Sequence, residues 1–206
     1  MEEKGISKAV IERLPRYFRY LGDLKDGGVE RISSHDLSVL MKVTASQIRQ
    51  DLNHFGGFGQ QGYGYNVKLL YDEISRILGL NREHRLILVG AGNLGQAITN
   101  YVNSEKRGFI IEGIFDIDVS KHGKLIRGIP VSGTDDMEAF IKENDIDIAV
   151  LTIPGPAAAG TAIRLVRYGI KGIWNFAHTD LNVPDNIKVV NVNLYDSLLE
   201  LSYELQ

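Results

Sequence analysis

The 206-residue sequence predicts a protein of the α/β class built from two domains and a terminal helix. Two short helices lie close together and are followed by a glycine- and aromatic-rich hairpin, which is typical of a winged helix with a helix-turn-helix. A strand, a glycine-rich loop and a helix follow, and strands and helices then alternate, which is typical of a Rossmann domain. We therefore expect a winged-helix domain over residues 1–80, a Rossmann domain over 81–193 and a C-terminal helix over 194–206.

The composition excludes several kinds of site. No cysteine is present, so disulfides, thiolate metal sites and cysteine nucleophiles are ruled out. The spacing of His, Asp and Glu suggests no metal site. Without a signal peptide or an apolar run of ~20 residues, we expect a cytoplasmic protein with no membrane contact. The formal net charge of −3 is not that of a strongly basic protein, so any nucleic-acid binding must depend on local cations and on dimerisation.

Two helices are expected before residue 29. Ser7 can cap a first short helix, and Pro15 suits the first position of a second one, because proline has no amide hydrogen to donate there. The second helix should end at Gly27-Gly28, since glycine favours helix C-termini.

The helix-turn-helix is expected between residues 33 and 55. Ser33 precedes a first helix that ends at Val43, and Thr44-Ala45-Ser46-Gln47 is a capping box that opens the second. The apolar positions of the first helix are Leu37, Leu40 and Met41, and those of the second are Ile48, Leu52 and Phe55. The stretch 58–67 predicts the hairpin of the wing, and a helix over 69–78 and a linker to residue 84 close the domain.

A polar stripe lies opposite the apolar face of the second helix. Its members, at spacings of i, i+3, i+4 and i+7, are Ser46, Arg49, Gln50 and Asn53. Such a stripe is often only a solvated face, but Arg, Gln and Asn can contact base edges in pairs, and this helix normally enters the major groove. Further candidates for contact with DNA are Arg16, Lys42, Thr44, Gln47, Gln60 and Gln61.

Five apolar segments from residue 85 onward are candidate strands of a parallel sheet, because helical stretches separate most of them. They are Leu86–Val89, Ile110–Phe115, Ile148–Leu151, Gly172–Trp174 and Val189–Val190. The segment 194–206 carries a broad apolar helical face, which should dock on another surface.

A dinucleotide-binding motif follows the first of these strands. The run Gly90-Ala91-Gly92-Asn93-Leu94-Gly95 lies between a strand and a helix, where this glycine spacing has physical meaning. Gly90 permits a tight turn, Gly92 lets the backbone approach a pyrophosphate, and Gly95 lets the helix pack on the strand. Asp116 ends the next strand about twenty residues later, where a carboxylate can hold the ribose hydroxyls, which favours NAD over NADP.

Two further segments are candidates for the cofactor site. Ile117 and Asp118 follow Asp116, and Asp118 either shares the ribose or is a solvated turn carboxylate. Thr152-Ile153-Pro154 leaves the carboxyl end of a strand, where ligands bind in such folds. Proline and glycine are common in any strand-to-helix turn, so both interpretations of this loop remain open.

Catalysis is not predicted. A dehydrogenase needs a proton donor or acceptor beside the transferred hydride, but Tyr168 and Lys171 are separated by two residues instead of the three of a Tyr-x-x-x-Lys pair. His178 is the remaining candidate, and a lone loop histidine is more often an exposed residue. An NAD-dependent oxidoreductase and a CoA- or nucleotide-binding module are the rival interpretations.

Four blocks in order carry a family resemblance. They are Arg13-Leu14-Pro15-Arg16-Tyr17 with Tyr20-Leu21, Ser46-Gln47-Ile48-Arg49-Gln50-Asp51-Leu52, Phe55-Gly56-Gly57-Phe58-Gly59 with Gly62-Tyr63-Gly64-Tyr65, and Val89-Gly90-Ala91-Gly92-Asn93-Leu94-Gly95. Through these blocks the sequence resembles the bacterial redox-sensing repressor family Rex, and the resemblance extends over essentially the whole length of the chain.

The resemblance implies a homodimer in which the C-terminal helix, about Leu194–Glu204, is swapped into the partner subunit. It also implies that the chain binds NAD and NADH, represses genes by binding double-stranded operator DNA when NADH is scarce, and is released by NADH. Tyr101 matches a family tyrosine linked to this switch. Many relatives carry Lys or Arg where this chain has Gln50 and Gln61, which implies weaker operator affinity here.

Overall fold

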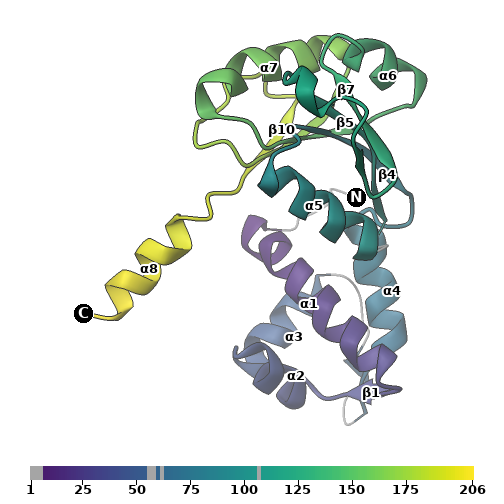
Figure 1. Cartoon of the computed structure of the whole chain (residues 1–206). Helices are drawn as coiled ribbons and strands as arrows, with labels where there is room; N and C mark the ends of the chain where they lie inside the picture. The colour runs from purple at the N-terminus through teal and green to yellow at the C-terminus, as the bar shows by residue number, and fades with distance from the viewer. Residues whose placement is uncertain (1–6, 55–58, 61–62, 106–107) are drawn as a thin grey trace. The chain divides into compact units, whose positions relative to one another are not determined.

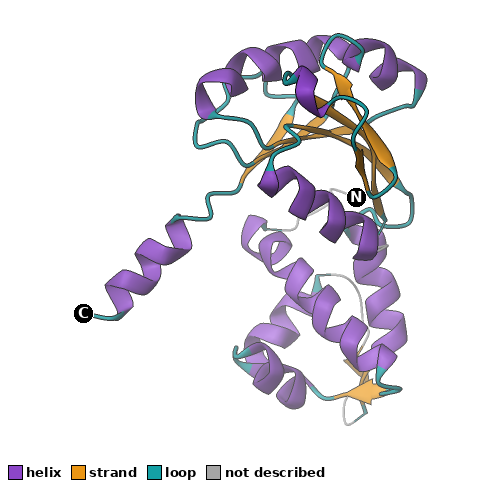
Figure 2. Ribbon diagram, viewed as in Figure 1, coloured by secondary structure: helices purple, strands orange, loops and turns teal. Residues whose placement is uncertain are grey.

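The computed structural model describes residues 7–54, 59–60, 63–105 and 108–206. The chain divides into two compact units, Met1–Arg82 and Glu83–Gln206. The first unit is mainly helical with a small sheet, and the second is a larger sheet between helices (Figures 1 and 2). Among the described helices, none combines the length and the hydropathy that a bilayer span requires.

The first unit is the winged helix that the sequence predicts. Its elements are α1 (Lys8–Asp26), β1 (Arg31–Ile32), α2 (Ser34–Met41), α3 (Ala45–Asn53), β2 (Gly59–Gln60), β3 (Gly64–Asn66) and α4 (Val67–Ile77). The strands form an antiparallel sheet in the order β1-β3-β2. The pair β2–β3 is the predicted wing hairpin, whereas β1 was not predicted, because two residues are too few to show a strand periodicity.

The helix α1 is continuous through Pro15, so the prediction of two separate helices is wrong. Proline cannot donate the helical hydrogen bond to the carbonyl of Ile11, but both residues are exposed, where water can solvate that oxygen. The buried residues of α1 form one stripe across the proline: Val10, Leu14, Tyr17, Phe18 and Leu21. Packing of this stripe outweighs the local cost, as tertiary context often does.

Side-chain caps fix the starts of the next three helices. The Ser33 hydroxyl accepts a hydrogen bond from the Asp36 amide at 3.0 Å, and the Thr44 hydroxyl accepts one from the Gln47 amide at 3.1 Å, at the starts that the sequence predicts. Asn66 caps α4 in the same way, and α4 begins at Val67, two residues before its predicted start.

The core of the first unit gathers residues from all four helices and the small sheet. One predicted core residue is not part of it, since Leu40 is 42% exposed. Leu37 and Met41 are four residues apart and lie one above the other toward the core, which leaves Leu40 on the side of α2. Phe55, also predicted to be buried, lies outside the described residues.

The second unit contains the five predicted strands and a hairpin that was not predicted. Its elements are β4 (His84–Val89), α5 (Asn93–Glu105), β5 (Phe109–Asp116), the 3₁₀ turn η1 (Val119–Lys121), β6 (Leu125–Ile126), β7 (Ile129–Gly133), α6 (Met137–Glu143), β8 (Ile148–Leu151), α7 (Gly155–Tyr168), β9 (Gly172–Asn175), β10 (Lys188–Asn191) and α8 (Asp196–Glu204). The sheet order is β10-β9-β8-β4-β5-β7-β6, and only β6 is antiparallel to its neighbour. Without β6, this is the doubly wound order 3-2-1-4-5-6 of dinucleotide-binding folds.

Helices cover both faces of this sheet (Figure 2). Side chains of β4 alternate between two apolar clusters: Leu86 and Leu88 pack with residues of α5, and Ile87 and Val89 pack with residues of α6 and α7. Because the last four residues of the strand, Leu86–Val89, are covered on both faces, they form a continuous apolar run. The ends of the strands therefore remain the places where polar groups gather.

The last helix, α8, buries none of its residues (Figure 1). Its exposed apolar side chains are Leu198, Leu199, Leu201 and Tyr203, flanked by Leu194, Tyr195 and Leu205. The apolar face expected from the sequence is thus present and uncovered in the single chain.

Replacing Pro15 with alanine is expected to raise the free energy of unfolding by about 1–2 kcal/mol. Proline inside a helix costs about 3 kcal/mol relative to alanine, and its restriction of the unfolded chain returns about 1 kcal/mol. Urea denaturation of the full chain measures the change. Glu12→Ala, at another exposed position of α1, should stay within about 0.5 kcal/mol. A P15A chain no more stable than the natural one would contradict the expectation.

Candidate nucleotide-binding site and DNA-binding face

The glycine loop after β4 is shaped by close backbone contacts. Gly90 has φ +107°, and a Cβ there would lie 2.6 Å from the carbonyl oxygen of Thr152. A Cβ at Gly95 would lie 2.1 Å from the carbonyl oxygen of Gly90. Both positions therefore require glycine, for the tight turn and the helix packing that the motif predicts.

Gly92 is different, because a Cβ added there would meet no atom within 4 Å. Neither crowding nor a positive φ explains a glycine at this position. The loop runs directly into the N-terminus of α5, where free amide groups and the helix dipole favour a negative charge. The open space beside Gly92 thus fits a phosphate-bearing ligand approaching the backbone.

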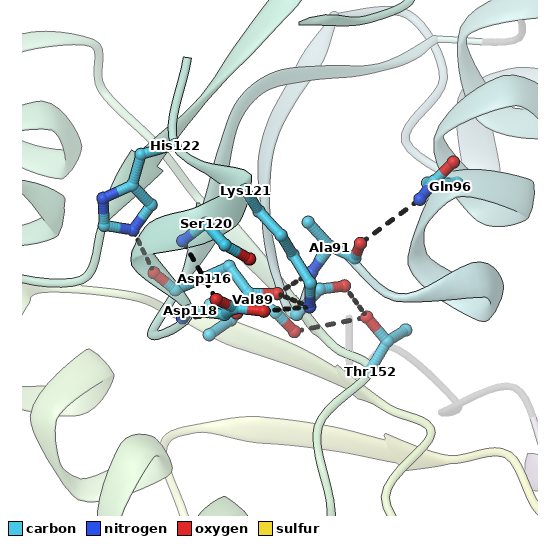
Figure 3. A network of polar contacts seen from close by, with 10 residues as sticks. Val89, Ala91, Gln96, Asp116, Asp118, Ser120, Lys121, His122 and Thr152 are labelled. Carbon is cyan, nitrogen blue, oxygen red and sulfur yellow. Dashed lines mark hydrogen bonds and ion pairs between the residues drawn. The ribbon is translucent and has the colours of Figure 1, made fainter. Parts of the chain in front are cut away.

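Asp116 lies at the end of β5 beside this loop and is 6% exposed. Its Oδ2 accepts hydrogen bonds from the Ala91 amide at 2.7 Å and the Lys121 ammonium at 2.8 Å, and its Oδ1 accepts one from the Asp118 amide at 2.8 Å (Figure 3). Burial alone would raise the pKa of Asp116, but these hydrogen bonds hold the pKa below its usual value. The predicted ribose acid is thus ionised and also anchors the glycine loop.

The turn after Asp116 is organised around that carboxylate. Asp118 caps η1 by accepting a hydrogen bond from the Ser120 amide at 3.0 Å, and its exposed carboxylate lies 3.9 Å from the Lys121 ammonium. The His122 ring nitrogen Nε2 lies 2.8 Å from the Asp116 carbonyl oxygen. Ile117 points into solvent. Lys121 was not predicted from the sequence, where its only signal was a lysine five residues after a strand-end aspartate.

The loop after β8 is tied to the glycine loop. The Thr152 hydroxyl donates to the carbonyl oxygen of Gly90 at 2.7 Å, and Ile153 is partly buried beside Gly90. Pro154 is exposed and directly precedes α7. The loops after β4, β5 and β8 therefore meet at one edge of the sheet, where the strand order reverses around β4, the usual ligand position of this fold.

A buried asparagine organises the loop after β9. The Asn175 amide donates to the Thr179 carbonyl and to the Asn191 side chain, both at 2.9 Å, and its own carbonyl accepts from the Ala177 amide at 3.1 Å. Sequence reasoning missed this residue, because strand periodicity gives no sign of a fully satisfied buried amide. His178, the one histidine considered for catalysis, is exposed on this loop.

On the first unit, the predicted polar stripe lies on one face of α3. Ser46, Arg49, Gln50 and Asn53 are all exposed, as are Thr44 and Lys42 at the preceding turn. Arg49 donates to the Ser34 hydroxyl at 3.1 Å, and Arg16 donates to the carbonyl oxygen of Met41 at 2.6 Å. The backbone of Gln60 lies in β2, and Gln61 lies outside the described residues.

Gln47 is not part of this exposed stripe, because its side-chain amide donates to Asp51 at 2.7 Å. Asp51 is fully buried and also accepts two hydrogen bonds from Arg13, each 2.7 Å, and one from the Tyr17 hydroxyl at 2.9 Å. Burial would raise the pKa of Asp51, but the hydrogen bonds from Arg13, Gln47 and Tyr17 lower it below its usual value. This buried ion pair, missed by the sequence analysis, fastens α3 to α1.

Both units match families of known proteins. A family model described as "CoA binding domain" matches residues 81–179, and one described as "Putative DNA-binding protein N-terminus" matches residues 5–53. The redox-sensing transcriptional repressor Rex of Clostridioides difficile (strain 630) is 58% identical over 200 residues, which cover 97% of this chain and 95% of that protein. The chain belongs to the Rex family of redox-sensing transcriptional repressors.

Solved structures of RSP, which is described as a Rex-family repressor, match nearly the whole chain as well. A crystal structure of RSP in complex with beta-NAD+ and operator DNA is 56% identical, with a TM-score of 0.92, and the match covers 98% of this chain and 93% of that one. The structure of RSP in complex with beta-NADH is 54% identical, with a TM-score of 0.88, and covers 97% and 94%. The order of a winged helix and a Rossmann unit is therefore that of Rex repressors.

Replacing Asp51 with asparagine is expected to lower the free energy of unfolding by about 3 kcal/mol near pH 7, because it leaves the partly buried Arg13 charge uncompensated. The pKa of Asp51 is lowered on folding, so its ionised form stabilises the fold above the unfolded pKa of about 4. That contribution is lost as the pH falls through the folded pKa. The difference between the natural chain and D51N should therefore shrink in acid.

Urea titrations at a series of pH values from about 7 down to about 3 measure this difference. Tyr17→Phe is the matched control, because it removes one hydrogen bond to Asp51 and keeps both the carboxylate and the core packing. It should cost about 1 kcal/mol. A D51N deficit that stays constant across the acid range would show that the Asp51 charge does not stabilise this unit.

Proposed function

We propose that this chain is a homodimeric transcriptional repressor that binds double-stranded operator DNA while NADH is scarce and leaves it when NADH binds. The observation that carries the proposal is the 98% coverage of the chain, at 56% identity, by a repressor structure described with both beta-NAD+ and operator DNA. The complete glycine loop at the strand-order reversal and the exposed polar face of α3 support the same conclusion.

The nucleotide would be held by the three loops that meet at the edge of the larger sheet. Gly90, Ala91, Gly92, Asn93, Leu94 and Gly95 would approach the pyrophosphate, Asp116, Ile117 and Asp118 would contact the adenosine end, and Thr152, Ile153 and Pro154 would line the remaining side. When bound, the cofactor supplies a nicotinamide ring that is positively charged as NAD and neutral as NADH. A partly dry pocket distinguishes these two charge states, which can favour two dimer arrangements unequally.

The operator would be read by α3 and by the cations near its start. Arg49, Gln50 and Asn53 carry the side chains for base edges, and Thr44, Ser46 and Lys42 are suited to phosphates. The contacts of Arg16 and Gln47 within the protein make them the weaker candidates. Gln50 and Gln61 are uncharged, so operator affinity would rest on fewer cations than in relatives with Lys or Arg there.

The dimer would be completed by the C-terminal helix. We propose domains over residues 1–80 and 81–193, with 194–206 swapped into the partner subunit, where the apolar face of α8 would be covered. Tyr101, 62% exposed on α5, is a candidate for the switch that NADH operates. The swapped helix would link nucleotide binding in one subunit to the arrangement of the other.

We further propose a regulatory and not a catalytic role, in the cytoplasm. The named relatives are repressors, and the Tyr168 hydroxyl accepts a hydrogen bond from the Arg164 Nε at 3.1 Å. The match to a CoA-binding family model supports one alternative to the repressor function, which is a CoA-binding module. Tighter binding of CoA than of NADH would favour that alternative.

Operator DNA should be released by NADH and retained with NAD+. Fluorescence anisotropy of a labelled duplex that carries a palindromic candidate operator measures this, with each nucleotide titrated separately at one fixed salt concentration, since affinity for DNA falls steeply with salt. Tight NADH binding without binding to any duplex would refute the repressor function.

Gly92→Ala is expected to weaken NADH binding about tenfold or more, while the melting temperature changes by less than about 3 °C. The added methyl group enters space that is empty of protein, so it obstructs a ligand without straining the fold. Calorimetric titration and thermal unfolding of one preparation separate the two effects. Gly160→Ala, also in open space but on α7, is the matched control and should bind NADH normally. Normal NADH binding by G92A would remove the loop from the site.

Deletion of residues 194–206 should abolish either the dimer or the NADH-dependent release of operator DNA. The deleted residues carry the exposed apolar face that we assign to the partner subunit. Analytical ultracentrifugation gives the oligomeric state, and the anisotropy titration gives the release. A truncated chain that remains a dimer and responds normally to NADH would exclude the swapped helix as the link.

A further inference from the structure

Lys121 forms an ion pair at the point where the adenosine ribose would lie. It comes from η1, and its ammonium is 2.8 Å from Asp116 Oδ2 and 3.9 Å from Asp118 Oδ2 (Figure 3). The Lys121 side chain is 31% exposed, so it is paired with the acid and still partly accessible from solvent. A lysine ammonium has three donors, and the contact with Asp116 uses one of them.

The carboxylate of Asp116 already accepts hydrogen bonds from other groups of the protein. Oδ2 accepts from the Ala91 amide and from Lys121, while Oδ1 accepts only from the Asp118 amide among the described residues. A carboxylate oxygen can accept about two hydrogen bonds, so Oδ1 retains capacity for a ribose hydroxyl. Lys121 therefore does not prevent the ribose contact, but it neutralises the charge of the acid that would make it.

This neutralisation bears on which nucleotides the site rejects. An acid at the end of the second Rossmann strand holds the ribose hydroxyls and repels a 2′-phosphate, which distinguishes NAD from NADP. With Lys121 paired to Asp116, the three charged groups at this edge sum to −1, whereas the two aspartates alone would give −2. The free donors of the lysine would also attract phosphate oxygens.

We propose that Lys121 is a specificity-determining residue that weakens the rejection of a 2′-phosphorylated nucleotide at this site. The inference rests on the proposed function, in which the site binds NADH. It goes further in assigning the selectivity between NADH and NADPH to the Lys121–Asp116 pair and not to Asp116 alone.

Calorimetric titration of the full chain with NADH and NADPH, at one salt concentration, tests the assignment in the natural protein and three variants. Lys121→Met removes the charge and is expected to raise the ratio of the NADPH and NADH dissociation constants about tenfold, because one nearby charge is lost opposite the phosphate. Lys121→Arg keeps the charge and should leave the ratio within about threefold. Lys124→Met removes an exposed lysine three residues along the same turn and should leave it within about twofold.

The outcomes separate this inference from the proposed function. If the natural chain binds no NADH, the proposed function and this inference both fall. If it binds NADH and K121M keeps the natural selectivity, the inference falls alone. Should K121M lose stability because Asp116 is left unpaired, Lys121→Gln decides, since it removes the charge but can still donate a hydrogen bond to Asp116, and natural selectivity in that variant would overturn the inference. Thermal unfolding of each variant identifies that case.

Discussion

The edge of the sheet where we propose that the nucleotide binds depends on a close approach of the loops after β4 and β8 that only glycine permits. Gly90 and Gly95 bring the loop after β4 so near to Thr152 and to the strand that a single methyl group would collide with backbone. The Ala91 amide is thereby free to donate to Asp116, which joins the ends of β4 and β5. The close packing at Gly90 and Gly95 leaves open space beside Gly92. The shape of this one loop therefore determines both the packing of the fold and the space for the proposed ligand.

Among the described residues, each unit contains one buried carboxylate that is kept ionised by a cation and neutral donors. Asp51 has Arg13, Tyr17 and Gln47, and Asp116 has Lys121 and two backbone amides. Such pairs contribute more to a defined geometry than to net stability, because desolvation offsets much of their attraction. In the winged helix this fixes the helix that carries the polar stripe, and in the Rossmann unit it fixes the glycine loop.

The sequence predicted the parts of the fold that periodicity and glycine spacing encode. All five predicted strands, the helix-turn-helix, the wing and the glycine loop are present. It failed where long-range packing decides: the stripe on α1 continues through Pro15, and Leu40 lies beside the core instead of within it. The partners of Asp51 and Asn175 come from positions up to 38 residues away, and no local pattern reports such contacts.

The exposed helix α8 is the part of the fold that a single chain does not stabilise by packing. A helix of nine residues is shorter than the ~12–15 at which isolated helices become even marginally stable in water, so its stability must come from packing. Its apolar side chains have no cover among the described residues of their own chain. In the homodimer that we propose, a second copy would supply that surface without a further protein, and helix formation would then depend on assembly. The folding of α8 and its docking on the partner would then be coupled in one equilibrium. Any change that a nucleotide causes at the interface would act on both together.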